Sequence, residues 1–142
     1  MQRPSLPKRA LDAPALGQKV GFTRTFTEAD VALFIGVTWD VNPYHTDAAF
    51  AEQTPFKRRI APGLLAASML THIGGLWAYL ATEMQFEFVQ PVYIPDTIAA
   101  EVEVIDVDDQ RGRVRLRMIC TNKEGEEVLR GECLGIPGSF DS

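Results

Sequence analysis

The stretch Pro62–Leu80, PGLLAASMLTHIGGLWAYL, constrains how the rest of this chain can fold. Its spacing predicts a helix whose apolar side chains lie on nearly every side, interrupted by Ser68, Thr71 and His72. A helix of this kind is stable in water only when other structure wraps around it. At 1.5 Å per residue it would be roughly 28 Å long. Pro62 suits the first turn, where a missing N–H group costs nothing.

The sequence after this helix changes to the two-residue period of β-strands. The alternating apolar positions are Phe86 and Phe88, then Ile98, Ala100, Val102 and Val104, then Val114, Leu116, Met118 and Cys120. Turn-forming clusters at residues 108–112 and 124–126 join these strands, and an earlier alternating segment, residues 19–25, adds a strand before the helix. We therefore expect an α+β fold in which an antiparallel sheet wraps around one long central helix.

Two shorter helices are expected between the first strand and the central helix. Thr27 has the character of an N-cap for a helix over residues 28–36, which has acidic residues in its first turn and an apolar stripe. Asp47 is placed to cap a second helix over residues 48–53.

Length and composition predict a single small domain. The 142 residues suffice for one core, and we expect the domain to span residues 16–142 after a flexible tail at residues 1–15. The tail has no apolar run typical of a secretory signal, and no stretch reaches the roughly 18 apolar residues of a membrane span. The formal net charge of -5 argues against nucleic acid or an anionic membrane as partner. These features favour a cytoplasmic protein.

Cysteine and histidine are too few and too scattered to suggest a metal site. Cys120 and Cys133 each fall within a predicted strand, so we expect buried thiols in a reducing compartment. Two histidines and two cysteines on separate elements do not form a zinc set. We therefore expect no metal.

A short segment before the central helix carries the chemistry. In Trp39-Asp40-Val41-Asn42-Pro43-Tyr44-His45, a carboxylate, an amide and an imidazole lie close together around a proline. We expect Pro43 to keep the backbone out of a helix and to hold Asn42 extended. Asp40 and His45 would then sit on a stiff loop, which suits catalysis because catalytic groups need a fixed mutual geometry.

These residues resemble a known family. Residues 40–45 are similar to the D-x-N-P-x-H motif of the MaoC-type hot-dog hydratases, a group of (R)-specific enoyl-CoA hydratases and related 3-hydroxyacyl thioester dehydratases. The similarity runs from about Gly17 to Ile136 and includes the helix start, residues 62–68, and the segment 88–97. It implies a hot-dog fold, in which the sheet wraps the central helix.

The resemblance implies an activity and its catalytic residues. The reaction would be the reversible, (R)-specific hydration of trans-2-enoyl-CoA to (R)-3-hydroxyacyl-CoA, with no cofactor. Asp40 and His45 would hold and activate one water molecule. The backbone N–H of Gly63, at the start of the central helix, would stabilise the enolate oxygen.

The resemblance also implies residues along the substrate path. Leu64 and Thr71 would lie near the acyl thioester, together with Asn42, which we expect mainly to brace its loop, and Pro62, which replaces the histidine of many relatives and lacks an N–H donor. The basic cluster Lys57-Arg58-Arg59 precedes Gly63 by a few residues. Arg58 and Arg59 are expected to bind the phosphates of CoA, although a solvated loop or a docking site for acyl carrier protein is also open.

Each of these residues has a simpler structural alternative. Asp40 would suit an Asx-turn, and His45 a packed or capping position. The Thr71 hydroxyl would also suit a bond back to the preceding helical turn, and Gly63 a close packing contact.

Three other functions compete with the hydratase. A 3-hydroxyacyl-ACP dehydratase would use the same residues, and a non-catalytic acyl-CoA-binding module would keep only the fold. A thioesterase is disfavoured because no Asp or Glu lies between Ala61 and Thr82, where that class carries its acid. One central helix is too little to cover a five-stranded sheet, so we also expect a homodimer.

Overall fold

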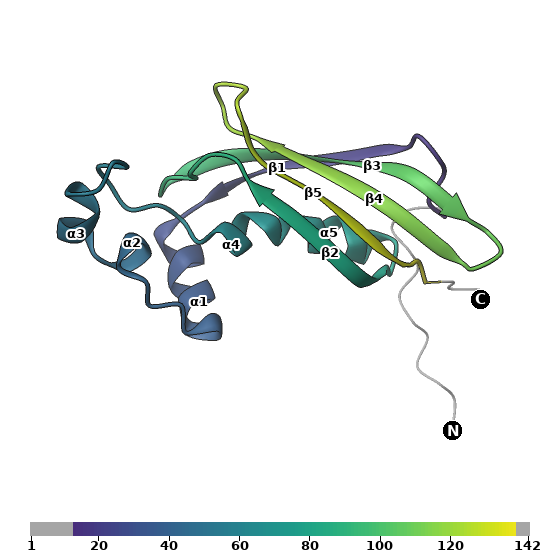
Figure 1. Cartoon of the computed structure of the whole chain (residues 1–142), viewed down its shortest axis with the longest axis horizontal. Coiled ribbons are helices and arrows are strands. Elements are labelled where there is room, and N and C mark those ends of the chain that lie inside the picture. The colour runs from purple at the N-terminus through teal and green to yellow at the C-terminus, as the bar shows by residue number, and fades with distance from the viewer. Residues whose placement is uncertain (1–12, 139–142) are drawn as a thin grey trace.

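The computed structural model describes residues 13–138, and the predicted tail at residues 1–15 lies almost wholly outside them. The elements occur in an order that begins with one strand, continues with helices and ends with four strands (Figure 1). They are β1 (Lys19–Phe26), α1 (Glu28–Thr38), α2 (Pro43–Thr46), α3 (Ala48–Glu52), α4 (Gly63–Ala67), α5 (Met69–Leu76), β2 (Leu80–Phe88), β3 (Asp96–Asp108), β4 (Arg113–Thr121) and β5 (Glu127–Ile136).

The predicted α+β hot-dog architecture is confirmed. The strands form one sheet of order β1-β3-β4-β5-β2, in which every neighbouring pair is antiparallel. The sheet curves over α4 and α5, which lie along one of its faces, while α1, α2 and α3 gather at one end of the molecule (Figure 1). Strand β1 pairs with β3, and β2 pairs with β5. The two strands that directly precede and follow the helices, β1 and β2, therefore lie at the two edges of the sheet.

The core lies between the inner face of the sheet and α4–α5. The alternating positions predicted on β3 and β4 are all buried, with exposures of 3% or less. The helical side chains that meet them include Ile73, and Trp77 follows directly after α5; both are fully buried. The two-residue period was therefore a reliable guide to the inner face, because each strand sends every second side chain to one side.

The central helix ends earlier than predicted. Ser68 divides it into α4 and α5, and α5 stops at Leu76 instead of running to Leu80. Ala78 adopts a left-handed conformation (φ 49°), its N–H donates to the Gly75 carbonyl (3.1 Å), and the Tyr79 N–H donates to the Gly74 carbonyl (2.9 Å). These two bonds form a Schellman motif, which satisfies the last carbonyls and turns the chain into β2.

The sheet covers only one side of this helix. Leu64, Thr71, His72 and Gly75 recur at helical spacing and are exposed. Edge strand β2 is similarly open, since Leu80, Met84 and Phe88 are 73%, 49% and 53% exposed.

The caps of the shorter helices match the sequence expectations, with one correction. Thr27 and Asp30 form a reciprocal capping box at the start of α1, and Asp47 accepts the Phe50 N–H (3.0 Å) at the start of α3. The expectation that Pro43 excludes helix was wrong: Pro43 opens α2, with Asn42 as its N-cap. Proline is compatible with the first helical position because that N–H needs no partner within the helix.

Residues 13–138 offer neither a membrane span nor a metal cluster. No helix of the structure is long and apolar enough to cross a bilayer, and no group of three or more His, Cys, Asp or Glu residues is arranged to hold a metal ion. Cys120 and Cys133 are free and buried in strands, as expected. Burial raises the pKa of the Cys120 thiol to about 12 and also raises that of Cys133, so neither is a reactive thiolate.

The tight contact between β2 and β5 generates a stability prediction. A Cβ at Gly131 would lie 2.6 Å from the Gln85 carbonyl oxygen and would also strike the Phe86 ring. We expect Gly131→Ala to lower the free energy of unfolding by about 1–3 kcal/mol, because the backbone oxygen cannot move without disturbing the sheet. Urea denaturation measures this change. Gly36→Ala is the control: it lies within α1 with no atom in the way, and it should raise stability by about 0.5–1 kcal/mol.

Candidate active site

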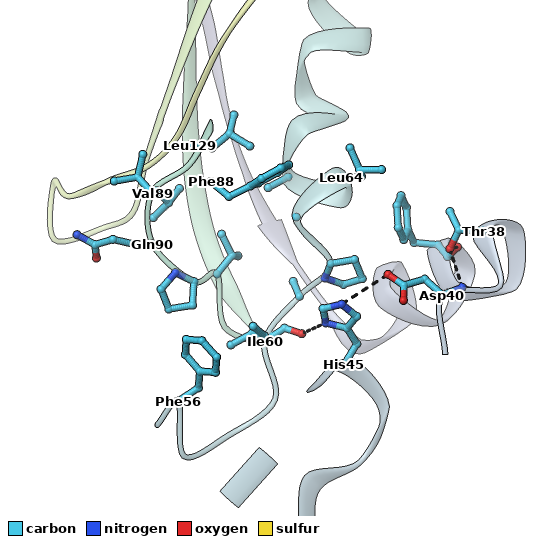
Figure 2. A pocket seen from close by; sticks show the side chains of 18 residues that line it. Thr38, Asp40, His45, Phe56, Ile60, Leu64, Phe88, Val89, Gln90 and Leu129 are labelled. Carbon is cyan, nitrogen blue, oxygen red and sulfur yellow. Dashed lines mark hydrogen bonds and ion pairs between the residues drawn. The ribbon is translucent and has the colours of Figure 1, made fainter. Parts of the chain in front are cut away.

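His45 is oriented by a hydrogen bond from its ring to the backbone. Its Nδ1 lies 2.7 Å from the carbonyl oxygen of Ile60, and a carbonyl can only accept, so Nδ1 carries the proton. In the neutral ring Nε2 is then the nitrogen without a proton, and it points toward Asp40 (Figure 2). The residue is only 8% exposed, which keeps the ring in this orientation. The bond fixes the tautomer that a general base requires.

Asp40 faces the free nitrogen of His45 from the end of α1. Its Oδ2 lies 3.6 Å from Nε2, its backbone N–H donates to the Thr38 hydroxyl (3.3 Å), and that hydroxyl donates to the Phe34 carbonyl (2.8 Å) (Figure 2). Asp40 Oδ1 also accepts a long bond from the Asn42 N–H (3.4 Å), so the Asx-turn is present too. The 3.6 Å separation exceeds a direct hydrogen bond but allows one water to bond to both groups.

The pair opens into an apolar cavity of about 530 Å³. Asp40, His45 and Thr38 contribute polar groups at one end, while aromatic and aliphatic side chains form most of the wall. That wall comes from α1, α4 and the segment before it, the end of β2 with the residues after it, and the start of β5: Phe34, Phe56, Ile60, Leu64, Phe88, Val89, Pro91, Val92, Val128 and Leu129. A volume of this size with a few convergent polar groups is typical of a small-molecule site.

Gly63 begins α4 at the wall of this cavity, after the N-cap Pro62. N–H groups in the first turn of a helix have no partner within the helix, so the Gly63 N–H is available to a ligand. A Cβ on Gly63 would lie 2.7 Å from two carbons of the Phe88 ring, so glycine is the residue that fits beside Phe88. The packing alternative for Gly63 therefore holds, and within the described residues its N–H makes no backbone hydrogen bond.

Five of the nine predicted site residues line the cavity, and the other four do not. Those lining it are Asp40, His45, Pro62, Gly63 and Leu64. Asn42 instead caps α2 by accepting the Tyr44 N–H (3.1 Å), which is the bracing role expected of it. Thr71, expected near the substrate, does not line the cavity: its hydroxyl donates to the Ser68 carbonyl (2.6 Å), and the residue is exposed.

The two arginines before Ile60 have different surroundings. The guanidinium carbon of Arg58 lies 3.9 Å above the centre of the Tyr93 ring, beside a shallow hollow that Lys57 and Arg59 also line. Arg59 donates to the His45 carbonyl (3.1 Å) and forms an ion pair with Glu28. Neither arginine lines the apolar cavity.

Comparison with known proteins places this geometry in a family. The model of the MaoC-like domain matches residues 12–127. The chain belongs to the MaoC-like domain family. It is 33% identical over 120 residues to an (R)-specific enoyl-CoA hydratase of Rhodospirillum rubrum, an alignment that covers 82% of this chain and 83% of that protein. It is 32% identical over 124 residues to a mitochondrial 3-hydroxyacyl-(acyl-carrier-protein) dehydratase of Solanum lycopersicum, which covers 82% of this chain and 73% of the relative.

A solved MaoC-like structure has the same fold. The (R)-hydratase of Aeromonas caviae involved in PHA biosynthesis superposes with a TM-score of 0.84 at 29% identity, covering 90% of this chain and all of that one.

Two residues important to this MaoC-like site were missed by sequence reasoning. Ile60 contributes only its carbonyl oxygen to His45, and no side-chain pattern reports a backbone acceptor. Phe88 was predicted only as an alternating apolar position of a strand, but its place at the end of β2 beside Gly63 makes it part of the cavity wall. Its alternation with Phe86 was the available signal, and it identified the strand without identifying the site.

Proposed function

We propose that this MaoC-like protein is a hydro-lyase that adds water to trans-2-enoyl-CoA and yields (R)-3-hydroxyacyl-CoA, without a cofactor. The observation that carries the proposal is the Asp40–His45 pair, 3.6 Å apart at the polar end of an apolar cavity. The hydratase of Rhodospirillum rubrum, similar over most of the chain, supports the same reaction. The reverse dehydration follows from the same groups by microscopic reversibility.

The chemistry follows from the hydrogen-bond inventory of the pair. A water bonded to the bare Nε2 of His45 and to the Asp40 carboxylate loses a proton to the pair as its oxygen attacks C3 of the enoyl thioester. The C2–C3 double bond opens toward the thioester carbonyl and gives an enolate. The pair returns one proton to C2, so the net change is addition of one water. Because both groups bond to one water on one side of the cavity, both new bonds form on that face of the substrate.

The Gly63 N–H is the proposed donor to the enolate oxygen. It stands at the start of α4, on the cavity wall, where the unpaired N–H groups of the helix favour negative charge. Pro62 and Leu64 would flank the thioester, since both line the cavity beside Gly63.

Free CoA is the favoured carrier, and acyl carrier protein is the second candidate. Arg58, with Lys57 beside it, lies on a segment that also contributes Phe56 and Ile60 to the cavity wall, which supports a contact between Arg58 and the phosphates of CoA. The plant dehydratase named for carrier-protein substrates supports the alternative. Both are electrostatic contacts that weaken with salt, so comparison of the two substrates is required to separate them.

Two further readings have less support. A non-catalytic acyl-CoA-binding module gains nothing from an acid and a base turned toward each other in its pocket. A thioesterase of this fold would need a carboxylate on the central helix, and α4 and α5 contain no Asp or Glu.

The direct test is hydration of crotonyl-CoA, followed by loss of the absorbance of the conjugated enoyl thioester. Conversion of the product by an (S)-specific 3-hydroxyacyl-CoA dehydrogenase would contradict the (R) assignment. A much higher kcat/KM on the carrier-protein thioester would reassign the carrier. Absence of hydration with both substrates would contradict the proposed function.

Removal of either member of the pair should abolish most turnover. We expect Asp40→Asn and His45→Gln each to lower kcat by at least about 10²-fold while the fold and substrate binding persist, because each removes a positioned acid–base group. The double variant should lose much less than the product of the two single losses, since both groups act on one water. Steady-state kinetics on crotonyl-CoA measure this. Near-normal turnover in either single variant would exclude the assignment.

A side chain at position 63 should damage activity more than stability. In Gly63→Val the new atoms must displace the Phe88 ring, which is half exposed and can turn toward solvent, but they remain where the thioester meets the N–H. We expect kcat/KM to fall at least about 10²-fold, with a small change in the unfolding midpoint. Gly36→Val is the matched control, because no atom lies near its Cβ in α1 and it does not line the cavity. Retained activity in folded Gly63→Val would place the oxyanion donor elsewhere.

We also propose a cytoplasmic homodimer that acts in fatty acid metabolism. Its support is the open β2 edge with Leu80, Met84 and Phe88, and the exposed side of α4–α5, both next to the cavity. Unpaired strand edges bearing apolar side chains are a liability that a second subunit removes.

Light scattering should give twice the 15.7 kDa chain mass. Met84→Glu places a charge on the exposed β2 edge and should shift the protein toward monomer, because the charge would be desolvated at the contact. Lys123→Glu, on the turn between β4 and β5, is a control for added negative charge. A wild-type protein that is monomeric and fully active would exclude the dimer.

A further inference from the structure

We propose that Arg59, held by Glu28, is a positioning residue that sets the place of His45 relative to Asp40. The inference rests on the proposed function, because it concerns the pair that this function uses. This role of Arg59 differs from the contact to CoA that the sequence led us to expect. It also connects Glu28 with the site, which no sequence pattern did.

The segment of Arg59 and Ile60 is joined to the turn of Tyr44 and His45 by three hydrogen bonds. The Ile60 N–H donates to the Tyr44 carbonyl (3.1 Å), and the His45 ring donates to the Ile60 carbonyl (2.7 Å). The third bond runs from Nη1 of Arg59 to the His45 carbonyl (3.1 Å). The backbone and the ring of the catalytic histidine are therefore both held from this one segment.

The other end of the same guanidinium reaches the helix that carries Asp40. Nη2 of Arg59 pairs with Oε1 of Glu28, the first residue of α1, and Asp40 follows the other end of that helix. Thr38, the last residue of α1, holds the Asp40 N–H. One planar, permanently charged group thus bonds both to the helix leading to the carboxylate and to the turn bearing the imidazole.

The surroundings of Arg59 favour this role over a contact to CoA. Its side chain is 25% exposed, whereas Glu28 is 62% exposed, so the guanidinium is the more sheltered member of the pair. Its two terminal amino groups already have acceptors. An ion pair at such a surface adds little to stability. Misplacement of a catalytic group by about 1 Å, however, can cost about 10²-fold in rate, so the effect should appear in turnover.

Kinetics on crotonyl-CoA separate positioning from substrate binding. Arg59→Gln should lower kcat at least about 10-fold and leave KM within about 2-fold, because ground-state binding is untouched. Glu28 is exposed at the start of α1, so Glu28→Ala should leave the fold intact. It should lower kcat less than Arg59→Gln does and leave KM unchanged. Arg24→Gln is the matched control: Arg24 pairs with Asp30 in the first turn of the same helix (2.7 Å) but does not contact the His45 turn, and kcat should not change. A raised KM with normal kcat in Arg59→Gln would overturn the proposal.

Charge reversal separates positioning from a simple ion pair. Glu28→Arg combined with Arg59→Glu restores opposite charges, but a glutamate cannot donate to the His45 carbonyl. We expect kcat of this double variant to stay as low as that of Arg59→Gln. Recovery of wild-type kcat would show that only the ion pair matters, and it would overturn the proposal.

Nitrogen NMR of the imidazole rings gives a readout that does not depend on activity. The chain has two histidines, His45 and His72, so ring signals are assignable by one substitution, His72→Gln. His45 should show Nδ1 protonation in the wild type and a shift toward a mixture of tautomers in Arg59→Gln. Unchanged His45 signals would overturn the positioning role. Changed signals in a protein that hydrates no enoyl thioester would retain that role and reject the proposed function.

Discussion

Burial of the apolar helix α4–α5 is the constraint on which the rest of the structure depends. Its core-facing residues reach full burial only because the inner side of the curved sheet supplies a continuous apolar surface, with Val102 and Leu116 among its fully buried members. At the end where α4 begins, β2 has finished and the chain leaves the sheet, and the cavity forms there. The cavity therefore lies at the end of the core, where β2 ends beside the start of α4.

Asp40 and His45 lie outside the space between the sheet and α4–α5, on the helical segments at one end of the molecule (Figure 1). Hydrogen bonds from the imidazole to the Ile60 carbonyl and from the Asp40 N–H to the Thr38 hydroxyl hold them there. Rigid placement at the surface of a core allows the pair to face water and an apolar cavity at once.

The sequence predicted the parts of this arrangement that are encoded locally. Strand alternation, the Thr27 and Asp47 caps and the Asp40–His45 segment were all identified, because each depends on residues within a few positions of one another. The end of α5 was missed because Ala78 occupies the left-handed position that glycine usually signals. The role of Pro43 was misjudged because proline both breaks helices and begins them, and the difference depends on whether its N–H would be needed. Contacts between distant segments, such as Phe88 beside Gly63, leave no local pattern.

In the cluster Lys57-Arg58-Arg59, basic residues that are adjacent in the sequence have different partners in the structure. Three adjacent basic residues suggest one site for phosphate, yet Arg58 stacks on Tyr93 and Arg59 is bonded to Glu28 and the His45 carbonyl. The Arg59 charge is largely compensated by its carboxylate partner, so any attraction for an anionic carrier must come mainly from Lys57 and Arg58. In a chain with a net charge of -5, an electrostatic patch of that size can orient a substrate locally but cannot attract it from a distance. Affinity for the thioester must then depend chiefly on the apolar cavity, and the sequence differences that tune substrate choice are expected in its wall.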